Sequence, residues 1–558
     1  MRGIPRDNGT TWRFDLVAGL TAAAVVLPKA MAYATVAGLP IAVGLYSAFV
    51  PMLIYALLGS SRVLNVSSTT TLAILTGTQL GLVVPDGDLE RLITATATLT
   101  ALVGIMLMLA AALRLGFVAN FISTPVLTGF KAGIGLVIVL DQLPKLLGVH
   151  LDKQGFFTDL LSLLQLLPHT SWSTLAVALL TLVALVGIER LWPQLPAPLV
   201  AMAGSIAAVW WLDLPELGVS IVGVIPQGLP SLTLPDVHLV LQLLPGALGI
   251  TLMSFTESIA AGRAFAAPYH PPINANRELL ATGAANLGGA LLGAMPAGGG
   301  TSQTALVKAA GGRSQKASLV TAAAAVATML LLAPLLGLLP HATLAAVVIV
   351  YSVGLIQPGE FRSILKIRSM EFRWACIACL GVLLFGTLQG IVVAIIASLL
   401  GLARQTATPR VYVLGRMPGS DVLRPLSAEH PDDETFDGLL LLRPEGRLFF
   451  LNAELVAEQI RGLLAKHQPK VLTLDLSRVT DIEYSALKML MEAERRAEEQ
   501  NTTLWLAGLN PEVLKMIHHA GLADRLGEER LLFNSRRAIA QYQEWQAQGR
   551  EHGAGNSA

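Results

Sequence analysis

The sequence predicts a polytopic α-helical membrane protein that continues into a small soluble α/β domain. Of its 558 residues, 53% are hydrophobic and only 14% are charged, which is too apolar for a soluble protein of this length. Apolar runs of roughly 20 residues, each long enough to cross about 30 Å of hydrocarbon, continue to about Leu402, after which the charge density rises. We therefore assign residues 1–408 to a membrane domain, 409–545 to a soluble domain and 546–558 to a disordered tail.

The membrane domain divides into about fourteen apolar segments, two of them short. Basic residues such as Arg62 and Arg114 fall on alternate connections, so the positive-inside rule places both termini in the cytoplasm. An amphipathic stretch at 156–167, preceded by Asp152 and Lys153, predicts a helix in the external membrane interface. The segments are 14–36, 41–58, 66–83, 92–113, 118–140, 172–191, 196–212, 238–261, 278–294, 301–310, 317–339, 342–356, 372–386 and 388–402.

Two polar segments interrupt the apolar pattern, the third in each set of seven. Residues 65–71 are rich in hydroxyl groups, and residues 298–305 begin with three glycines. Irregular backbone at membrane depth is tolerated only where it lines a cavity, and matching breaks in two halves indicate an inverted repeat with a binding site at the midplane. Small residues that merely pack helices closely are the alternative, which explains one such segment better than two in register.

The glycine segment has the properties of an anion site. A helix that starts at about Thr301 would direct free N–H groups and the positive end of its dipole toward the glycines. If the 65–71 segment points inward from the other side, two positive ends converge on one anion. We therefore predict a seven-plus-seven inverted repeat around an anion site. The candidate substrate-binding residues of the broken segments are Ser68, Thr69, Thr70, Gly300, Thr301, Ser302 and Gln303.

Two charged residues lie within apolar spans. Glu257 belongs to the span 238–261, where a carboxylate costs ~2.5 kcal/mol or more near the helix centre, so we expect it to face the cavity. The alternative is that it pairs with a neighbour and holds two helices together. Lys29 lies too deep in the first span to reach the interface, so it either neutralises Glu257 or attracts the substrate anion. We include Lys29 among the candidate substrate-binding residues.

Short motifs recur along nearly the whole chain, at residues 28–34, 37–40, 44–48, 59–62, 125–130, 142–144, 255–259, 276–279 and 302–305. In their order and spacing they resemble the sulfate permease (SulP) family of anion transporters. The resemblance implies a seven-plus-seven inverted repeat, a core domain that moves against a gate domain, a homodimer and a cytoplasmic STAS domain. It also implies that Glu257 helps to bind a coupling cation, because cation-coupled members carry an acidic residue there.

The chain departs from the commonest family pattern at two positions. Many members carry glutamine where this chain has Lys29, and several carry arginine where it has Gln303. We interpret this difference as a positive charge transferred from one segment to the other, which strengthens a substrate role for Lys29. Lys131, in the fifth span, is expected in the gate domain or at the cytoplasmic end of its helix, and we assign it no role.

The tail resembles a transporter STAS domain in the motifs at 449–453, 475–477 and 481–487. Soluble relatives are phosphorylated at the position of Ser485, but the adjacent Glu483 favours a plain N-cap here. We expect this domain to bind either a cytoplasmic protein or a nucleotide, although no P-loop supports a nucleotide. The pattern of a small α/β sandwich predicts strands at 439–442, 448–451, 471–474 and 503–507, and helices at 453–466, 485–500 and 511–520.

These features predict a secondary active transporter of a small inorganic anion in a cell inner membrane. Sulfate is the favoured substrate and a proton the favoured coupling ion, because a glutamate suits a proton carrier whereas sodium needs several oxygen ligands. Sodium-coupled transport of bicarbonate or a dicarboxylate is the alternative. A membrane-anchored STAS sensor or scaffold is an alternative of another class.

Other functional classes find no support in the sequence. It contains no paired carboxylates, metal-ligand cluster or nucleophile triad, so we expect neither an enzyme nor a cofactor beyond a coupling proton or sodium ion. Cys376 and Cys379 lie in an apolar span without histidine or acid at ligand spacing, and we interpret them as small hydrophobic residues. A net charge of +1 and the absence of a basic arm argue against nucleic acid.

Overall fold

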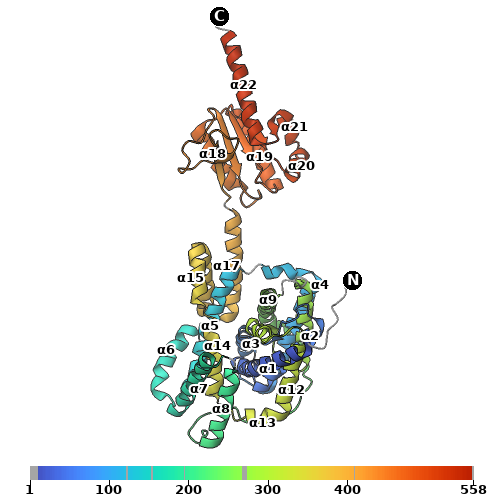
Figure 1. The fold of residues 1–558 in the computed structure, drawn as a ribbon, viewed down its shortest axis with the longest axis vertical. Helices are drawn as coiled ribbons and strands as arrows, with labels where there is room; N and C mark the ends of the chain where they lie inside the picture. Colours follow the sequence, from blue (N-terminus) through green and yellow to red (C-terminus); the bar gives the residue numbers. More distant parts are fainter. Residues whose placement is uncertain are drawn as a thin grey trace. The chain divides into compact units, whose positions relative to one another are not determined.

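The computed structural model describes residues 11–120, 123–151, 155–193, 195–225, 227–266, 273–407 and 409–555. The chain forms two compact units, the first ending at Leu399 and the second beginning at Leu400. Figure 1 shows that the first unit is helical and that the second combines helices with strands. The boundary between the units falls inside helix α17 (Thr387–Ala407). The boundary predicted from the sequence, between residues 408 and 409, lies at the end of the same helix.

Helices fill the first unit. Each of the fourteen apolar segments expected from the sequence contains a helix. Eight of the described helices are long and apolar enough to cross a membrane, which makes this unit a multi-pass membrane region. In chain order the helices before α17 are α1 (Thr11–Val36), α2 (Ile41–Leu58), α3 (Thr70–Val83), α4 (Leu89–Ala112), η1 (Leu115–Asn120), α5 (Thr124–Leu147), α6 (Phe156–Leu166), α7 (Trp172–Leu191), α8 (Ala197–Leu212), α9 (Val240–Ala264), α10 (Ala275–Leu291), α11 (Thr301–Ala309), α12 (Lys316–Ala327), α13 (Ala333–Leu336), α14 (His341–Val353), α15 (Pro358–Ile367) and α16 (Ser369–Phe385).

Four of these helices depart from simple apolar spans. The amphipathic stretch after residue 155 forms α6 as expected, whereas Asp152 and Lys153 lie outside the described residues. A second amphipathic helix, α15, lies between the predicted segments 342–356 and 372–386, where no helix was expected. A π-helical turn at Thr328–Leu332 separates α12 from α13, so one predicted segment contains two helices.

The membrane helices pack as two groups. The core group comprises α1–α4 and α9–α13, and the gate group comprises α5–α8 and α14–α17. Figure 1 shows α5, α7 and α14 together on one side, and α1, α2 and α12 together on the other. Within the core group, α4 and α10 approach closely where Gly104 faces Gly283. The approach depends on the glycines, because a Cβ atom at either position would meet the backbone of the other helix. The two groups touch where α1 packs against α14 and α8.

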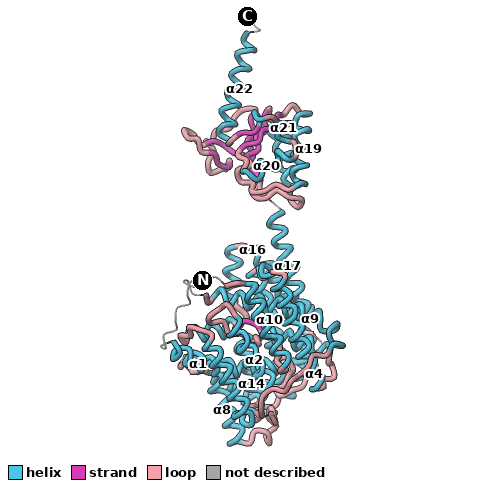
Figure 2. Tube along the Cα trace, turned by 90° about the vertical axis from the view of Figure 1, so that its right-hand side faces the viewer, coloured by secondary structure: helices cyan, strands magenta, loops and turns pink. Residues whose placement is uncertain are grey.

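The second unit is built around a mixed six-stranded sheet (Figure 2). Its strand order is β4-β3-β5-β6-β7-β8, with β5 to β8 parallel and β3 antiparallel to both of its neighbours. Buried leucines of the central strands pack against α18 to α20 on one face and against Tyr542 of α22 on the other. The elements are β3 (Val411–Arg416), β4 (Leu423–Pro425), β5 (Leu439–Pro444), α18 (Ala453–His467), β6 (Val471–Asp475), α19 (Tyr484–Glu499), β7 (Thr503–Ala507), α20 (Pro511–His519), α21 (Leu522–Leu526), β8 (Leu531–Leu532) and α22 (Ser535–Gly555).

Three expectations for the soluble domain need correction. The predicted strand at 448–451 is a turn with one bridge at Leu448, because the Asn452 side chain accepts the Phe449 N–H and bends the chain. Ser485 is the second residue of α19 and not its N-cap; Glu483 holds the N-cap position. Helix α22 continues to Gly555 through most of the tail expected to be disordered from residue 546, while residues 556–558 lie outside the described residues.

Candidate functional site

The two broken segments meet inside the core group. Strand β1 (Val66–Ser67) pairs antiparallel with β2 (Gly298–Gly299), and helices α3 and α11 begin directly after them. A further bond from Gly300 N to Asn65 O, 3.1 Å long, extends the pairing. The first N–H groups of a helix have no partner within the helix, and they carry the positive end of its dipole. Two such helix starts therefore lie at one junction, as the sequence pattern suggested.

The glycines of this junction serve close packing. A Cβ atom at Gly299 would lie 2.7 Å from the Cα atom of Ser258 on α9, too close for any side chain without a backbone shift. The amide of Gly299 donates a 2.7 Å hydrogen bond to the Ser258 hydroxyl. The sequence indicated an anion site at this glycine segment, whereas at Gly299 the near neighbour is helix α9.

Glu257 is tied to the start of α3. Its carboxylate Oε2 accepts a 2.8 Å hydrogen bond from the hydroxyl of Thr69, and only 6% of the residue is exposed. The same hydroxyl caps α3 by accepting from Leu72 N at 3.3 Å. A change in charge at Glu257 is therefore felt directly at the helix start that faces the junction.

Gln303 braces the two broken segments. Its side chain accepts a 2.7 Å hydrogen bond from the Ser67 hydroxyl and donates one of 3.2 Å to Ser68 O. The Ser68 hydroxyl in turn donates to Pro296 O at 2.8 Å. With 1% of Gln303 exposed, the amide holds β1 against the start of α11. In this arrangement both ends of the Gln303 amide are occupied by protein groups.

Lys29 does not contact Glu257. Its ammonium nitrogen lies 3.7 Å from the centroid of the Tyr351 ring on α14, in the gate group, and the residue is 3% exposed. Within the described part of the chain no ion pair joins Lys29 to Glu257. One turn further along α1, Tyr33 is also buried, and α1 packs against both α3 and α11. Helix α1 thus lies between the junction helices and the gate group, which Lys29 contacts at Tyr351.

The structure brings most of the expected site residues together. Ser68, Thr69, Thr70, Gly300, Thr301, Ser302 and Gln303 all lie at the junction, and Glu257 reaches it from α9. The side chains of Thr301 and Ser302 are exposed, unlike their buried neighbours. Lys29 lies at the edge of the junction, on α1, whereas Lys131 lies on α5 in the gate group. Their roles in binding stay predictions.

Sequence reasoning missed Tyr33, Tyr351 and Ser258. Tyr33 belongs to a motif that was noted without a role, and Ser258 directly follows Glu257. Tyr351 carries no local signal, because an aromatic residue in an apolar span is ordinary. Only the packing of α14 against α1 marks it.

Two polar segments that pair at the starts of α3 and α11, beside a buried carboxylate bonded to the start of α3, define the architecture of a membrane transporter. The chain matches the sulfate permease family over residues 13–378 and the STAS domain over residues 430–538. It is 34% identical over 539 residues to a probable sulfate transporter of Mycobacterium tuberculosis, covering 96% of each chain. It is 29% identical over 541 residues to the chloroplastic sulfate transporter 4.1 of Arabidopsis thaliana, covering 93% of this chain and 78% of that protein.

The protein belongs to the sulfate permease family, whose members are transporters and not enzymes, and it carries a C-terminal STAS domain. Two solved structures share its fold. The murine Solute Carrier 26 family member A9 anion transporter in the inward-facing state superposes with a TM-score of 0.88 at 23% identity, covering 97% of this chain and 92% of that one. The transmembrane domain of a cyanobacterial bicarbonate transporter gives 0.59 at 24% identity, covering 70% of this chain and 98% of that domain.

Proposed function

We propose that this protein transports a small inorganic oxyanion across the membrane, with sulfate as the first candidate. The observation that carries the proposal is the β1–β2 pairing, which brings the starts of α3 and α11 to one junction lined by hydroxyl groups. N–H groups and hydroxyls at converging helix starts suit an oxyanion. The names of the relatives in Mycobacterium tuberculosis and Arabidopsis thaliana favour sulfate among such anions.

We propose that the anion moves together with a proton bound at Glu257. An ionised carboxylate hydrogen-bonded to the start of α3 would repel an anion at the same junction, so anion binding favours neutralisation of Glu257. A proton neutralises Glu257 by binding to its carboxylate alone. Sodium would need several oxygen ligands, of which Thr69 offers one hydroxyl, and it stays the alternative coupling ion.

Bicarbonate transport and a sensor or scaffold role are the two alternative functions. Bicarbonate is the second substrate candidate, because a bicarbonate transporter domain shares the fold and the junction selects for charge and size. A STAS sensor or scaffold merely anchored in the membrane has no use for a carboxylate and an ammonium buried within its spans. The burial of Glu257 and Lys29 therefore favours transport.

We further propose an inner-membrane location with both termini in the cytoplasm, a homodimer, and a cytoplasmic protein partner for the STAS domain. Support for the orientation comes from basic residues on alternate connections, such as Arg114 after α4 and Arg190 at the end of α7. The dimer and the partner rest on the family resemblance.

Uptake into proteoliposomes tests the proposed function. The purified protein is reconstituted, and labelled sulfate is supplied under an inward pH gradient, an inward sodium gradient or neither. We expect accumulation with the pH gradient alone and competition by unlabelled sulfate. Accumulation that requires sodium would replace the proton, and accumulation of bicarbonate but not sulfate would replace the substrate. If the folded protein binds no anion, transport at this junction is contradicted.

A further inference from the structure

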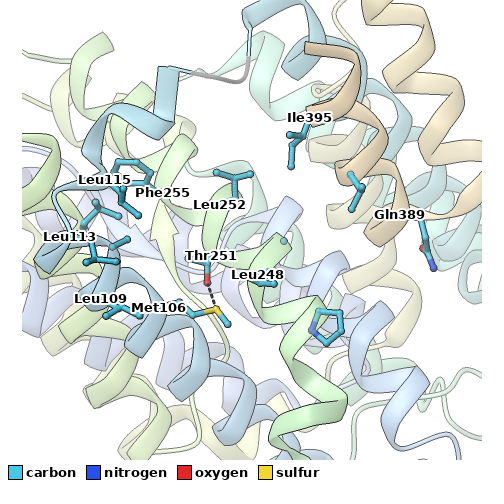
Figure 3. A pocket seen from close by; sticks show the side chains of 15 residues that line it. Met106, Leu109, Leu113, Leu115, Leu248, Thr251, Leu252, Phe255, Gln389 and Ile395 are labelled. Atoms are coloured by element: carbon cyan, nitrogen blue, oxygen red, sulfur yellow. Dashed lines mark hydrogen bonds between the residues drawn. The ribbon is translucent and has the colours of Figure 1, made fainter. Parts of the chain in front are cut away.

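An apolar groove of about 730 Å³ lies between helices of both groups (Figure 3). Its walls come from α4, α9 and the start of α10 in the core group, and from α17 in the gate group. Phe255 of α9 lines the groove, whereas Glu257 belongs to the junction. Because successive helical residues are rotated by about 100°, these two side chains leave α9 on opposite faces. The groove is therefore separate from the proposed anion site.

The groove offers almost nothing to a polar occupant. Among its lining side chains only Thr251 and Gln389 are polar. The Thr251 hydroxyl is directed at the sulfur of Met106, 3.5 Å away, and Figure 3 shows the Gln389 amide pointing away from the other lining side chains. Water in such a space would forfeit hydrogen bonds without gaining others. An apolar occupant is required.

The length of the groove matches one leaflet of a bilayer. Its wall on α9 runs from Pro245 to Phe255, a rise of roughly 15 Å at the standard helical spacing. The hydrocarbon core of a bilayer is about 30 Å thick, so half of it is one leaflet. The groove belongs to the multi-pass membrane region, where lipid is the surrounding solvent. The acyl chain of a phospholipid fits both its length and its chemistry.

Two exposed arginines lie at the Phe255 end of this groove. Arg114 stands between the lining residues Leu113 and Leu115, and Arg277 precedes the lining residue Leu279 by two positions. A 3.0 Å hydrogen bond from Gly116 N to the Asn276 side chain joins the two segments. Guanidinium groups bind phosphate through paired N–H donors; the Nε of Arg277 already donates a 3.0 Å hydrogen bond to Leu58 O, so Arg277 offers its two terminal nitrogens. Their position complements the negative headgroup of a lipid whose tail lies in the groove.

We propose that the groove binds one anionic phospholipid, with an acyl chain along α9 between α4 and α17 and with its phosphate at Arg114 and Arg277. The bound chain touches helices of both the core group and the gate group. It acts as a fixed component of the contact between them, distinct from lipids that cover the outer surface. The proposal concerns lipid binding and does not depend on which anion is transported.

Photo-crosslinking of the full-length protein tests this site. The protein is reconstituted in phosphatidylcholine doped with phosphatidylglycerol that carries a diazirine in its acyl chain, and labelled peptides are located by mass spectrometry. We expect label on 245–255 of α9 and 389–395 of α17, several-fold above the exposed apolar face of α7 around Leu180 and Val183. The same diazirine on phosphatidylcholine should label the groove less.

Substitutions identify the headgroup contacts. We expect Arg114→Asn and Arg277→Gln each to lower phosphatidylglycerol labelling of the groove by about fivefold, the effect of one basic residue near an anionic lipid surface. Asparagine tolerates the left-handed backbone at Arg114, where φ is 56°. Arg190→Gln, at the end of α7, is the matched control and should leave groove labelling unchanged. Ala110→Trp fills the groove and should reduce labelling even though Arg114 and Arg277 are both unaltered.

Three outcomes would overturn the proposal. Equal labelling of the α7 face and the groove would mean ordinary surface lipid. Equal labelling by the two headgroups would remove the role of the arginines. An unlabelled groove in protein of normal thermal stability would remove the lipid altogether. If an arginine variant melts at a lower temperature, the headgroup comparison on the unaltered protein decides the matter.

Discussion

The ammonium nitrogen of Lys29 on α1 lies 3.7 Å from the centroid of the Tyr351 ring on α14. The contact joins the core group to the gate group, and Lys29 is 3% exposed. A desolvated cation–π contact is worth about 2 kcal/mol or more, enough to offset much of the penalty of a buried ammonium. Lys29 therefore has a partner within the protein, and this partner is not Glu257.

The Lys29–Tyr351 contact should appear as an energetic coupling. We expect Tyr351→Leu and Lys29→Gln each to lower stability, and their combination to be less destabilising than the sum by about 2 kcal/mol. Tyr351→Phe keeps the ring face and serves as the control, with stability close to that of the unaltered protein. Thermal unfolding in detergent measures all four. Strict additivity would show that the ring does not stabilise the ammonium.

Lys29 should also contribute to anion binding. We expect Lys29→Gln to weaken sulfate affinity more than it weakens folding, because the ammonium is a buried positive charge on α1, which packs against α3 and α11 at the junction. Titration of sulfate at one fixed pH measures the affinity. Combining it with Glu257→Gln separates two explanations: a pure Lys29–Glu257 pair predicts restored tight binding, and a substrate role predicts binding that stays weak. Unchanged affinity in Lys29→Gln would leave Lys29 a structural charge.

Glu257 should be essential for coupling but not for folding. Glu257→Gln keeps the shape and can still accept a hydrogen bond from Thr69, yet it can neither carry a charge nor release a proton. We expect gradient-driven sulfate accumulation to be lost while the melting temperature stays near normal.

Glu278 provides the contrasting control for this substitution. It is fully buried and accepts hydrogen bonds from the Tyr55 hydroxyl and from the N–H and hydroxyl of Ser60, so Glu278→Gln should lower stability instead. Accumulation that persists in Glu257→Gln under either a pH or a sodium gradient would remove Glu257 from the coupling mechanism.

Gly299 should tolerate no side chain. A Cβ atom there would lie 2.7 Å from the Ser258 Cα atom, so Gly299→Ala must displace β2 from α9. We expect a loss of about 1–3 kcal/mol in stability together with loss of transport. Gly81→Ala in α3 is the control, because nothing lies within 4 Å of its Cβ position and alanine favours the helix. A fully active Gly299→Ala would mean that the β1–β2 junction is loosely held.

Asp475 should make the STAS domain sensitive to acid. Burial alone would raise the pKa of its carboxyl group, but hydrogen bonds from Ser477, Ser535 and Arg443 outweigh burial and hold the pKa below its ordinary value. A carboxylate with a lowered pKa contributes stability above its unfolded pKa of about 3.9, and this contribution is lost as the pH falls through the lowered value.

Urea unfolding of residues 409–555 at a series of pH values measures this contribution. We expect Asp475→Asn to cost about 3 kcal/mol at neutral pH, because it leaves the largely buried Arg443 without its ionic partner, and to flatten the acid limb of the stability curve. Asp432→Asn, at an exposed position, should change neither. An acid limb that keeps its slope in Asp475→Asn would assign the pH dependence to other carboxylates.

The sequence alone determined the class of protein and the position of its two polar segments. Membrane insertion depends on the local run of apolar residues, so the helical segments could be located without knowledge of any contact. The polar interruptions at 65–71 and 298–305 were equally visible, because hydroxyls and glycines at membrane depth require a cavity. The cost of burying a charge within a membrane span identified Glu257 and Lys29 as candidate site residues.

The tertiary structure alone decided which groups these residues contact. Gln303 braces Ser67 and Ser68, and Lys29 meets Tyr351, because helix packing and rotation bring together residues that are remote in the sequence. A shift of one residue turns a helical side chain by about 100°, so no periodic pattern fixes such partners. The groove between α9 and α17 arises in the same way, since each wall by itself reads as an ordinary apolar helix.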